Sequence, residues 1–458
     1  MKTKRPNRPN FFLARMLLAF LLAPLAGKAQ SYVGHAFDNY AGVHGVLYNP
    51  ASVVGTPMRT DINLFSVSGF VGSDYFAVSL NDMLGAEDGF DFDEVADRFP
   101  SDRNNFFANA DLLGPSFMFN MGERHSIAIT TRARGFLNLN SISGNLYENI
   151  SDGFDETQDF DFDMQDLSAN LHVFGEIGLT YGRVLLEKQT GFLKAGATFK
   201  YLFGAGGLFT NAPQLAGTYS VENNTLTTNG SLDYGTTQDF ESDDITFDNL
   251  QGGFGLNLGM VYEYRPRIMN GAVLGRRQQL YKLKLGIAVT HIGAINYSQS
   301  EISTYDLNGS VPVSEFDQKD IEDVLNDNYN GTESTVATKL KLPTTMHLTA
   351  DYHIKGLLYT GLHGAVSMIK SGTPRANGTI NTLTLAPRME TKAFSLYTPL
   401  TLRQYGSFLW GLGFRLGPLT IGSGSVLTNL ISKNSKAADF YFGLKIPLYK
   451  KIDFENRS

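Results

Sequence analysis

Cysteine is absent from the chain, and tryptophan occurs once, as Trp410. Without cysteine there are no disulfides, and there is no thiol to carry a bacterial lipid anchor. Glycine, phenylalanine and tyrosine are instead abundant, at 47, 33 and 21 of the 458 residues. This composition suits a transmembrane β-barrel, whose apolar band is flanked by aromatic girdles.

Long hydrophobic runs are also missing after residue 25. The one run, residues 16–25, follows five basic residues and precedes the small residues of 26–29. This is the layout of a secretory signal, predicted at residues 1–29 with cleavage after Ala29. A retained membrane anchor is the alternative, but the run is about half the roughly 20 apolar residues that a spanning helix needs.

Positive charge is scarce. The formal net charge is -7, and the mean hydropathy of -0.14 is that of a soluble protein. A nucleic-acid partner is disfavoured, because proteins that bind nucleic acid present basic patches. Since no later run is long enough for a spanning helix, an exported membrane protein of this sequence has to be a barrel.

Strict alternation marks the segment GFGLNLGMVYEY, residues 253–264. Apolar side chains fill one face and small or polar side chains fill the other, which is the period of a β-strand. Leu258 is predicted to face lipid, and Asn257 and Glu263 are predicted to face a lumen. The same pattern recurs at 171–182, 281–290, 358–368 and 440–449.

These strands are longer than the usual five or six residues of globular sheets and suit a tilted strand that crosses a bilayer. Short turns alternate with long polar stretches, which are predicted to be loops at 81–111, 141–166, 210–250 and 299–338. We predict an all-β fold, a transmembrane antiparallel β-barrel of about 14 strands, with about 12 possible, in the outer membrane. The barrel is predicted to span residues 61–450, followed by a short periplasmic tail at 451–458. A large secreted sandwich or repeat protein is the alternative.

Four short motifs carry a family resemblance: GVLYNPASVVG from Gly45, LPTTMHLTADY from Leu342, GLGFRLGPLTIGSG from Gly411 and ADFYFGLKIPL from Ala438. The first resembles the Asn-Pro-Ala segment that opens long-chain fatty-acid transporters of the FadL type and their relative PorV, a barrel of type IX secretion. Together the motifs resemble a Bacteroidota outer-membrane family related to those barrels. The resemblance implies an N-terminal plug over residues 30–60 that contains Asn49, Pro50 and Ala51.

The residues of this stretch favour the same placement. Residues 30–57 are too irregular and too rich in glycine for a strand, yet Val43, Val46 and Val53 make it too apolar for a free tail. We therefore expect the stretch to be buried in the lumen, with Pro50 as a fixed bend.

The sharpest polar cluster is HLTADYHI. His347, Thr349, Asp351 and His353 share one face at intervals of about 6.6 Å, and His363 on the next strand is expected to join them. The other candidates for lining the lumen are Asn257, Glu263, Lys282, Lys284 and Lys445. A histidine beside an aspartate can act as a general base or bind a metal, but a barrel lumen is polar in any case. We predict no enzyme activity, no metal site and no cofactor.

The acidic stretch 152–166 contains no basic residue. It is either a calcium loop or a solvated hairpin with an aromatic face, and no glycine occupies the sharp-turn position of a calcium loop. Residues 317–325 are predicted to form a short helix that caps the lumen.

Two functions remain open. In the first, the barrel binds or passes small hydrophobic compounds, as the FadL resemblance implies. In the second, it is a non-enzymatic component of protein secretion or cell-surface assembly, as the PorV resemblance implies. The expected partners are outer-membrane lipid together with a hydrophobic small molecule or a secretion-system protein.

Overall fold

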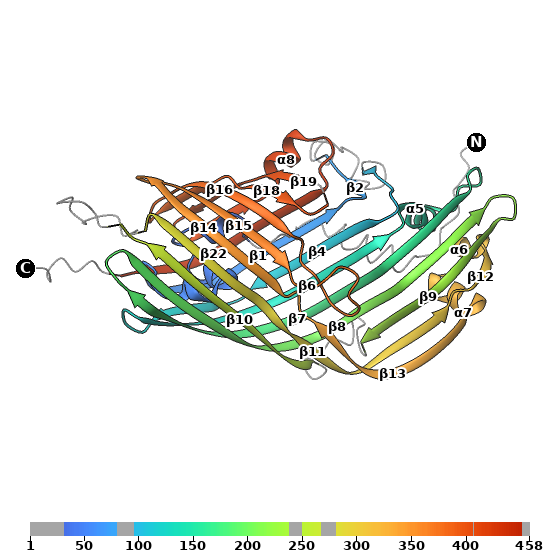
Figure 1. Ribbon diagram of the computed structural model, residues 1–458, viewed down its shortest axis with the longest axis horizontal. Helices are drawn as coiled ribbons and strands as arrows, with labels where there is room; N and C mark the ends of the chain where they lie inside the picture. The colour runs from blue at the N-terminus through green and yellow to red at the C-terminus, as the bar shows by residue number, and fades with distance from the viewer. Residues whose placement is uncertain (1–31, 80–95, 238–249, 267–280, 406, 451–458) are drawn as a thin grey trace, which may run out of the picture.

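The computed structural model describes residues 32–79, 96–237, 250–266, 281–405 and 407–450. The predicted signal peptide at 1–29 and the predicted tail at 451–458 lie outside these ranges. The described chain forms a long antiparallel sheet that closes on itself where β1 pairs with β22, with Ile62 opposite Ile446 (Figure 1).

A closed antiparallel barrel of 14 strands is the main body of the molecule. Three of its strands are each made of two short pieces that follow one another along the same neighbouring strand. In chain order the barrel strands are β1 (Met58–Ser73), β4 with β5 (Asn104–Leu113, Ser116–Asn120), β6 (His125–Ile142), β7 (Phe160–Glu187), β8 (Gly191–Ser220), β10 (Gln251–Tyr264), β11 (Leu283–Asp306), β14 (Thr345–Lys355), β15 (Leu358–Ser367), β16 (Thr382–Glu390), β17 with β18 (Phe394–Tyr397, Leu400–Arg403), β19 with β20 (Ser407–Trp410, Leu412–Leu416), β21 (Leu419–Ser423) and β22 (Ala437–Tyr449). The predicted fold class is confirmed, at the higher of the two strand counts.

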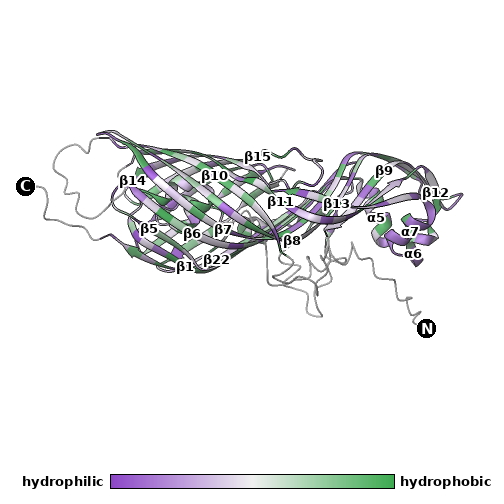
Figure 2. Cartoon of the chain, turned by 90° about the horizontal axis from the view of Figure 1, so that it is seen from below, coloured by the Kyte–Doolittle hydropathy of each residue, from purple (hydrophilic) through white to green (hydrophobic). Residues whose placement is uncertain are grey.

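Apolar side chains cover the outside of the barrel wall. Leu258, Ile177 and Leu348 are each 45% exposed, whereas their neighbours Asn257 and Glu176 point inward and are buried. Figure 2 shows this alternation as green and purple patches along the barrel strands. A continuous apolar belt around a closed barrel is the surface that lipid covers, and the protein is an outer-membrane protein.

Short turns join the barrel strands at one end. They lie at 121–124, 188–190 and 356–357, on the left of Figure 1, near the end of β22. The longer connections lie at the opposite end. In outer-membrane barrels the short turns face the periplasm, so the opposite end faces the cell exterior.

Three strands continue past the barrel on the exterior side and build a second body, which we call the head (Figure 2). The outer part of β7 pairs there with that of β8. The outer parts of β8 and β11 both pair with β9 (Thr225–Thr237), which also pairs with β12 (Gly309–Pro312), and β11 pairs with β13 (Asn330–Lys341). The loops predicted at 141–166, 210–250 and 299–338 are therefore wrong in large part, because much of each stretch is strand or helix.

Helices pack on the head sheet around a separate apolar core. They are α5 (Gly144–Asp152), α6 (Ser314–Gln318) and α7 (Ile321–Asn328). The single helix predicted at 317–325 is divided between α6 and α7. Their Leu146, Phe316 and Val324 join Phe162, Met164, Leu215 and Tyr219 of the sheet. A two-stranded ribbon, β2 (Phe76–Ala77) with β3 (Asp97–Arg98), lies beside this core.

Outside the head, helix α8 (Val426–Ile431) lies between β21 and β22 and packs against β19. Of the helices in the described ranges, none is long and apolar enough to cross a membrane.

Candidate functional site

Residues 32–57 lie inside the barrel, and we call them the lumenal segment. They contain η1 (His35–Phe37), α2 (Val43–Tyr48) and η2 (Pro50–Val53). Val43, Ala51, Val53 and Val54 are completely buried. In Figure 1 this segment is the blue coil enclosed by the left part of the barrel.

The Asn49-Pro50-Ala51 motif binds the wall through the asparagine side chain. The Asn49 Nδ2 donates to the carbonyl oxygens of Met260 (3.1 Å) and Ile287 (3.2 Å), on β10 and β11. Its Oδ1 accepts from the backbone N–H of Ala51 at 3.0 Å and so caps η2, with Pro50 at the first helical position. The motif is a bent anchor, buried within the lumen.

Glycines on three adjacent strands make room for this anchor. A Cβ at Gly196 on β8 would lie 2.5 Å from the carbonyl carbon of Pro50, and Gly182 and Gly259 on β7 and β10 likewise face Val53 and Asn49. The small inward face of the alternating strands is therefore the surface on which the lumenal segment packs.

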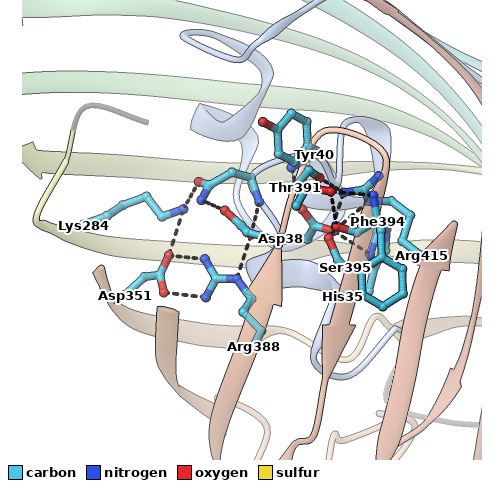
Figure 3. Close-up of polar contacts among 12 residues, drawn as sticks. His35, Asp38, Tyr40, Lys284, Asp351, Arg388, Thr391, Phe394, Ser395 and Arg415 are labelled. Carbon is cyan, nitrogen blue, oxygen red and sulfur yellow. Dashed lines mark hydrogen bonds and ion pairs between the residues drawn. The ribbon is translucent and has the colours of Figure 1, made fainter. Parts of the chain in front are cut away.

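Asp38 ties the first half of the segment to the opposite wall (Figure 3). Its Oδ2 accepts from the Arg415 Nε (2.8 Å) and from the Ser395 hydroxyl (2.6 Å), and all three side chains are fully buried. The next residue, Asn39, donates from Nδ2 to a Glu390 oxygen at 2.5 Å. Burial makes these pairs sensitive to the loss of either partner.

Asp351, one of the predicted lumen residues, lies at the centre of the neighbouring network. It accepts from the two terminal nitrogens of Arg388 at 2.6 and 2.8 Å and from the Tyr281 hydroxyl at 2.6 Å. The amine of the predicted Lys284 lies 3.3 Å from the same carboxylate and donates to Asn39 at 2.9 Å (Figure 3). Asp351 therefore pairs with cations, and no histidine is among its bonded partners in the described ranges.

Two other candidates are linked to the lumenal segment, Lys445 directly and Glu263 through a lysine. The Lys445 amine donates to the carbonyls of Tyr40 (2.6 Å) and Ala41 (2.9 Å). Glu263 pairs with Arg265 at 2.6 Å and lies 3.5 Å from the Lys194 amine, which itself donates to the Val54 carbonyl at 2.8 Å. Both side chains are buried in the lumen.

The predicted histidines divide into an inner pair and an outer one. His347 Nδ1 lies 3.0 Å from His363 Nε2, and the rings are nearly parallel with centroids 5.3 Å apart. Rings of Phe37 and Tyr48 from the lumenal segment contact this pair edge to face. Thr349 pairs with His363 in the strand register and is half-buried. His353 instead lies by the 356–357 turn, where it stacks on Tyr359 and bonds the Gly356 carbonyl.

Lys282, predicted to line the lumen, does not face it. Its amine sits 4.4 Å from the ring centroid of the exposed Tyr352 and donates to the His353 carbonyl, on the outer side of the rim. Tyr281, expected from the alternation on the lipid side, is buried against Asp351. The reason is that β11 begins only at Leu283, so the two-residue period does not extend back to these positions.

A charged cluster that sequence reasoning missed lies on the wall formed by β4, β6, β7, β8 and β11. Arg132 bonds Asp111 and, at 3.0 Å, Glu176, which also accepts from the Lys200 amine at 3.0 Å. Arg134 lies 3.3 Å from Asp111, and its Nη1 is 3.0 Å from the Nδ1 of His291. The backbone N–H of His291 donates to the Oδ1 of the predicted Asn257. The cluster holds three cations and two carboxylates. The Arg-x-Arg spacing of residues 132 and 134 was its one sequence signal.

Between the lumenal segment and this wall lies a cavity of about 100 Å³. Its apolar lining comes from Phe37, Leu47, Phe70, Phe107, Phe136 and Ile380. Its polar lining comes from Arg132, Arg134, His291, His347, His363, Asn109 and Asn138. No group of three or more His, Asp or Glu side chains suited to a metal occurs in the residues that the structure describes.

Residues 50–424 match the sequence profile of the Family of unknown function (DUF5723). The chain belongs to this family. None of the curated proteins matches the chain. The expected relation to PorV and to the Bacteroidota stays a prediction that no comparison supports.

Several solved structures resemble this member of the family. The CymD monoaromatic hydrocarbon channel shares 10% identity at a TM-score of 0.43, covering 90% of this chain and 94% of that one. A Pseudomonas aeruginosa FadL homologue shares 11% identity at a TM-score of 0.43, covering 92% of this chain and 96% of that one. The P. putida toluene transporter TodX shares 7% identity at a TM-score of 0.41, covering 90% of this chain and 95% of that one. Because these identities and TM-scores are low, the function of this protein has to be argued from its own residues.

Proposed function

We propose that this protein binds small hydrophobic compounds in its lumen and passes them across the outer membrane, with the lumenal segment as its plug. The cavity between the plug and the barrel wall carries the proposal. Sites for small molecules are mainly apolar, with a few polar groups that fix orientation, and this lining has that composition.

The size of the cavity limits what fits while the plug stays in place. Apolar cavities of roughly 150 Å³ accommodate one benzene ring, so a cavity of about 100 Å³ holds a small group or one end of a longer molecule. A longer compound needs the plug to shift. Phe37, Leu47 and Tyr48 are the plug side chains that it would displace.

The charged cluster favours compounds with a negative end. Arg132 and Arg134 line the cavity, and their cluster has one more cation than carboxylate. A carboxylate placed there gains charge-assisted hydrogen bonds, which are about twice as strong as neutral ones. The apolar rings opposite would hold the hydrocarbon part.

Binding of octanoate and octanol by the detergent-solubilised protein tests this proposal. Arg134→Gln should weaken octanoate binding by about tenfold, since a bond to a charged group contributes roughly 1.5–3 kcal/mol, and should leave octanol binding unchanged. Lys433→Gln, at an exposed residue outside the cavity, is the matched control. Equal losses for both ligands would remove the charge preference, and absence of binding of either ligand would remove the function.

A further inference from the structure

The helix α8 turns its apolar side away from the protein. Val426, Leu427, Leu430 and Ile431 lie at the spacing of one helical face, and none of them is buried. Leu430 is 43% and Ile431 72% exposed, the latter the highest value among the large apolar side chains of the described residues. In an aqueous environment these exposed parts of Leu430 and Ile431 would meet water.

The polar side of α8 points at the barrel instead. The Thr428 hydroxyl accepts from the backbone N–H of Trp410 on β19 at 2.7 Å. The Asn429 amide bonds the hydroxyls of Ser425 (3.3 Å) and Ser435 (2.5 Å). A surface helix of a water-soluble protein has the reverse arrangement, with its apolar stripe toward the core.

The surroundings of α8 on the barrel wall are apolar as well. Phe408 and Trp410 on β19, the strand that α8 packs against, are 54% and 39% exposed, and Leu402 on the paired β18 is 58% exposed. The outward face of α8 is thus continuous with the lipid-covered belt. In the described part of the head, by contrast, Val336 is the one large apolar side chain of comparable exposure.

We propose that α8 lies in the outer leaflet of the membrane, where lipid acyl chains cover Leu430 and Ile431. The inverted placement of its polar and apolar sides fits an apolar solvent, because polar groups in lipid have to be satisfied within the protein. The continuity with the belt assigns lipid, and not a second protein, as the partner. The membrane surface of this protein therefore includes a helix outside the strand wall.

The chain is suited to a direct test, because Trp410 is its one tryptophan and it has no cysteine. The full chain is reconstituted into phosphatidylcholine vesicles with and without brominated lipid, and Trp410 emission is recorded. Separately, Ile431→Cys carries a nitrobenzoxadiazole label. Leu258→Cys in the belt and Thr332→Cys on β13 of the head carry the same label as references.

Brominated lipid should quench most of the Trp410 emission. The label at residue 431 should be blue-shifted and quenched by lipid-borne quencher, as at residue 258, and should resist aqueous iodide. Iodide quenching equal to that at residue 332 would place α8 in water, and shielding from both quenchers would mean that protein covers the helix. Either result overturns the proposal. The tryptophan measurement uses the unaltered chain, so it does not depend on folding of the cysteine variants.

Discussion

Single residues decide which face of a strand meets lipid. Leu258 is 45% exposed on the belt, and its neighbour Asn257 is buried and accepts a bond from His291. The alternation of residues 253–264 was enough to predict both orientations, because adjacent side chains of a strand always point to opposite faces. Asn257 carries a specific bond that the alternation did not show.

Arginine at Leu258 should destabilise the barrel by about 2–4 kcal/mol if the residue lies near the bilayer midplane, since the charge must enter hydrocarbon. Unfolding by urea in lipid vesicles measures this loss. Thr332→Arg, on an exposed strand of the head, is the control and should be neutral within about 0.5 kcal/mol. Equal tolerance of both changes would mean that the belt is not covered by lipid.

At Gly196 a single methyl group should disturb the packing of the lumenal segment. Its Cβ would lie 2.5 and 2.6 Å from backbone atoms of Pro50 and Ala51, so Gly196→Ala should cost about 1–3 kcal/mol through overpacking. Gly364→Ala is the matched control, because nothing lies within 4 Å of a Cβ there. Midpoints of chemical denaturation compare the two variants. A loss no greater than that of the control would show that the segment does not press on this wall.

Among the elements, the lumenal segment is the one whose removal should change function. Deleting residues 30–57 should leave an assembled barrel that conducts ions across planar bilayers, while the intact protein stays mostly closed. The barrel itself is retained because β1 pairs with β22, β4 and β5, and none of these contacts involves the segment. Equal conductance of both proteins would contradict the plug assignment.

The docking of this segment should weaken in acid. Burial lowers the pKa of His35 to about 3, with Lys445 and Arg415 acting in the same direction and Asp38 against it, and burial also holds the pKa of His44 well below its usual range. A histidine whose pKa is lowered on docking stabilises the docked state fully above its free pKa of about 6.5 and loses that contribution as pH falls.

Between pH 7.5 and pH 5 the loss should be about 2 kcal/mol for His35. Conductance of the intact protein in planar bilayers should therefore rise at pH 5. His35→Gln, which cannot gain the proton, should show a smaller rise. A conductance independent of pH, or a response unchanged in the variant, would speak against this contribution.

At the level of elements, the strands of the head were not predicted from the sequence. Strand β13 has exposed side chains on both faces over residues 330–337, so its sequence lacks the apolar alternation that marks a strand. In β7, Phe160 and Phe162 alternate with acidic residues, but the stretch was interpreted as a loop hairpin. β13 is a strand because it pairs with β11, and this part of β7 is a strand because it pairs with β8. A single sequence does not show such pairing.

For the whole molecule, the barrel was predictable and the charged clusters were not. The belt follows from composition and a period of two, which are local properties. Arg132 on β6 meets Asp111 on β4 and Glu176 on β7, and those pairs depend on the register of neighbouring strands. Side chains that meet across a sheet are brought together by pairing that sequence spacing does not contain.

The orientation of the molecule predicts one protease result. Proteinase added to intact cells should cut within residues 155–158, which are exposed in the head between α5 and β7. The turn at 188–190 should be cut only after the outer membrane is permeabilised. Mass spectrometry of the fragments tells the two sites apart, and the reverse order of cleavage would mean that the head faces the periplasm.

Strands β7 and β8, of 28 and 30 residues, have a mechanical consequence. At about 3.3 Å per residue each is roughly 90–100 Å long, about three times the hydrocarbon thickness of a bilayer. Their lower parts carry Glu176 and Lys200 beside the cavity, and their upper parts form the head. The head and the charged wall are thus built from the same two continuous strands. A sideways force on the tip of the head would act on the lumen wall through these strands, with no loop between them.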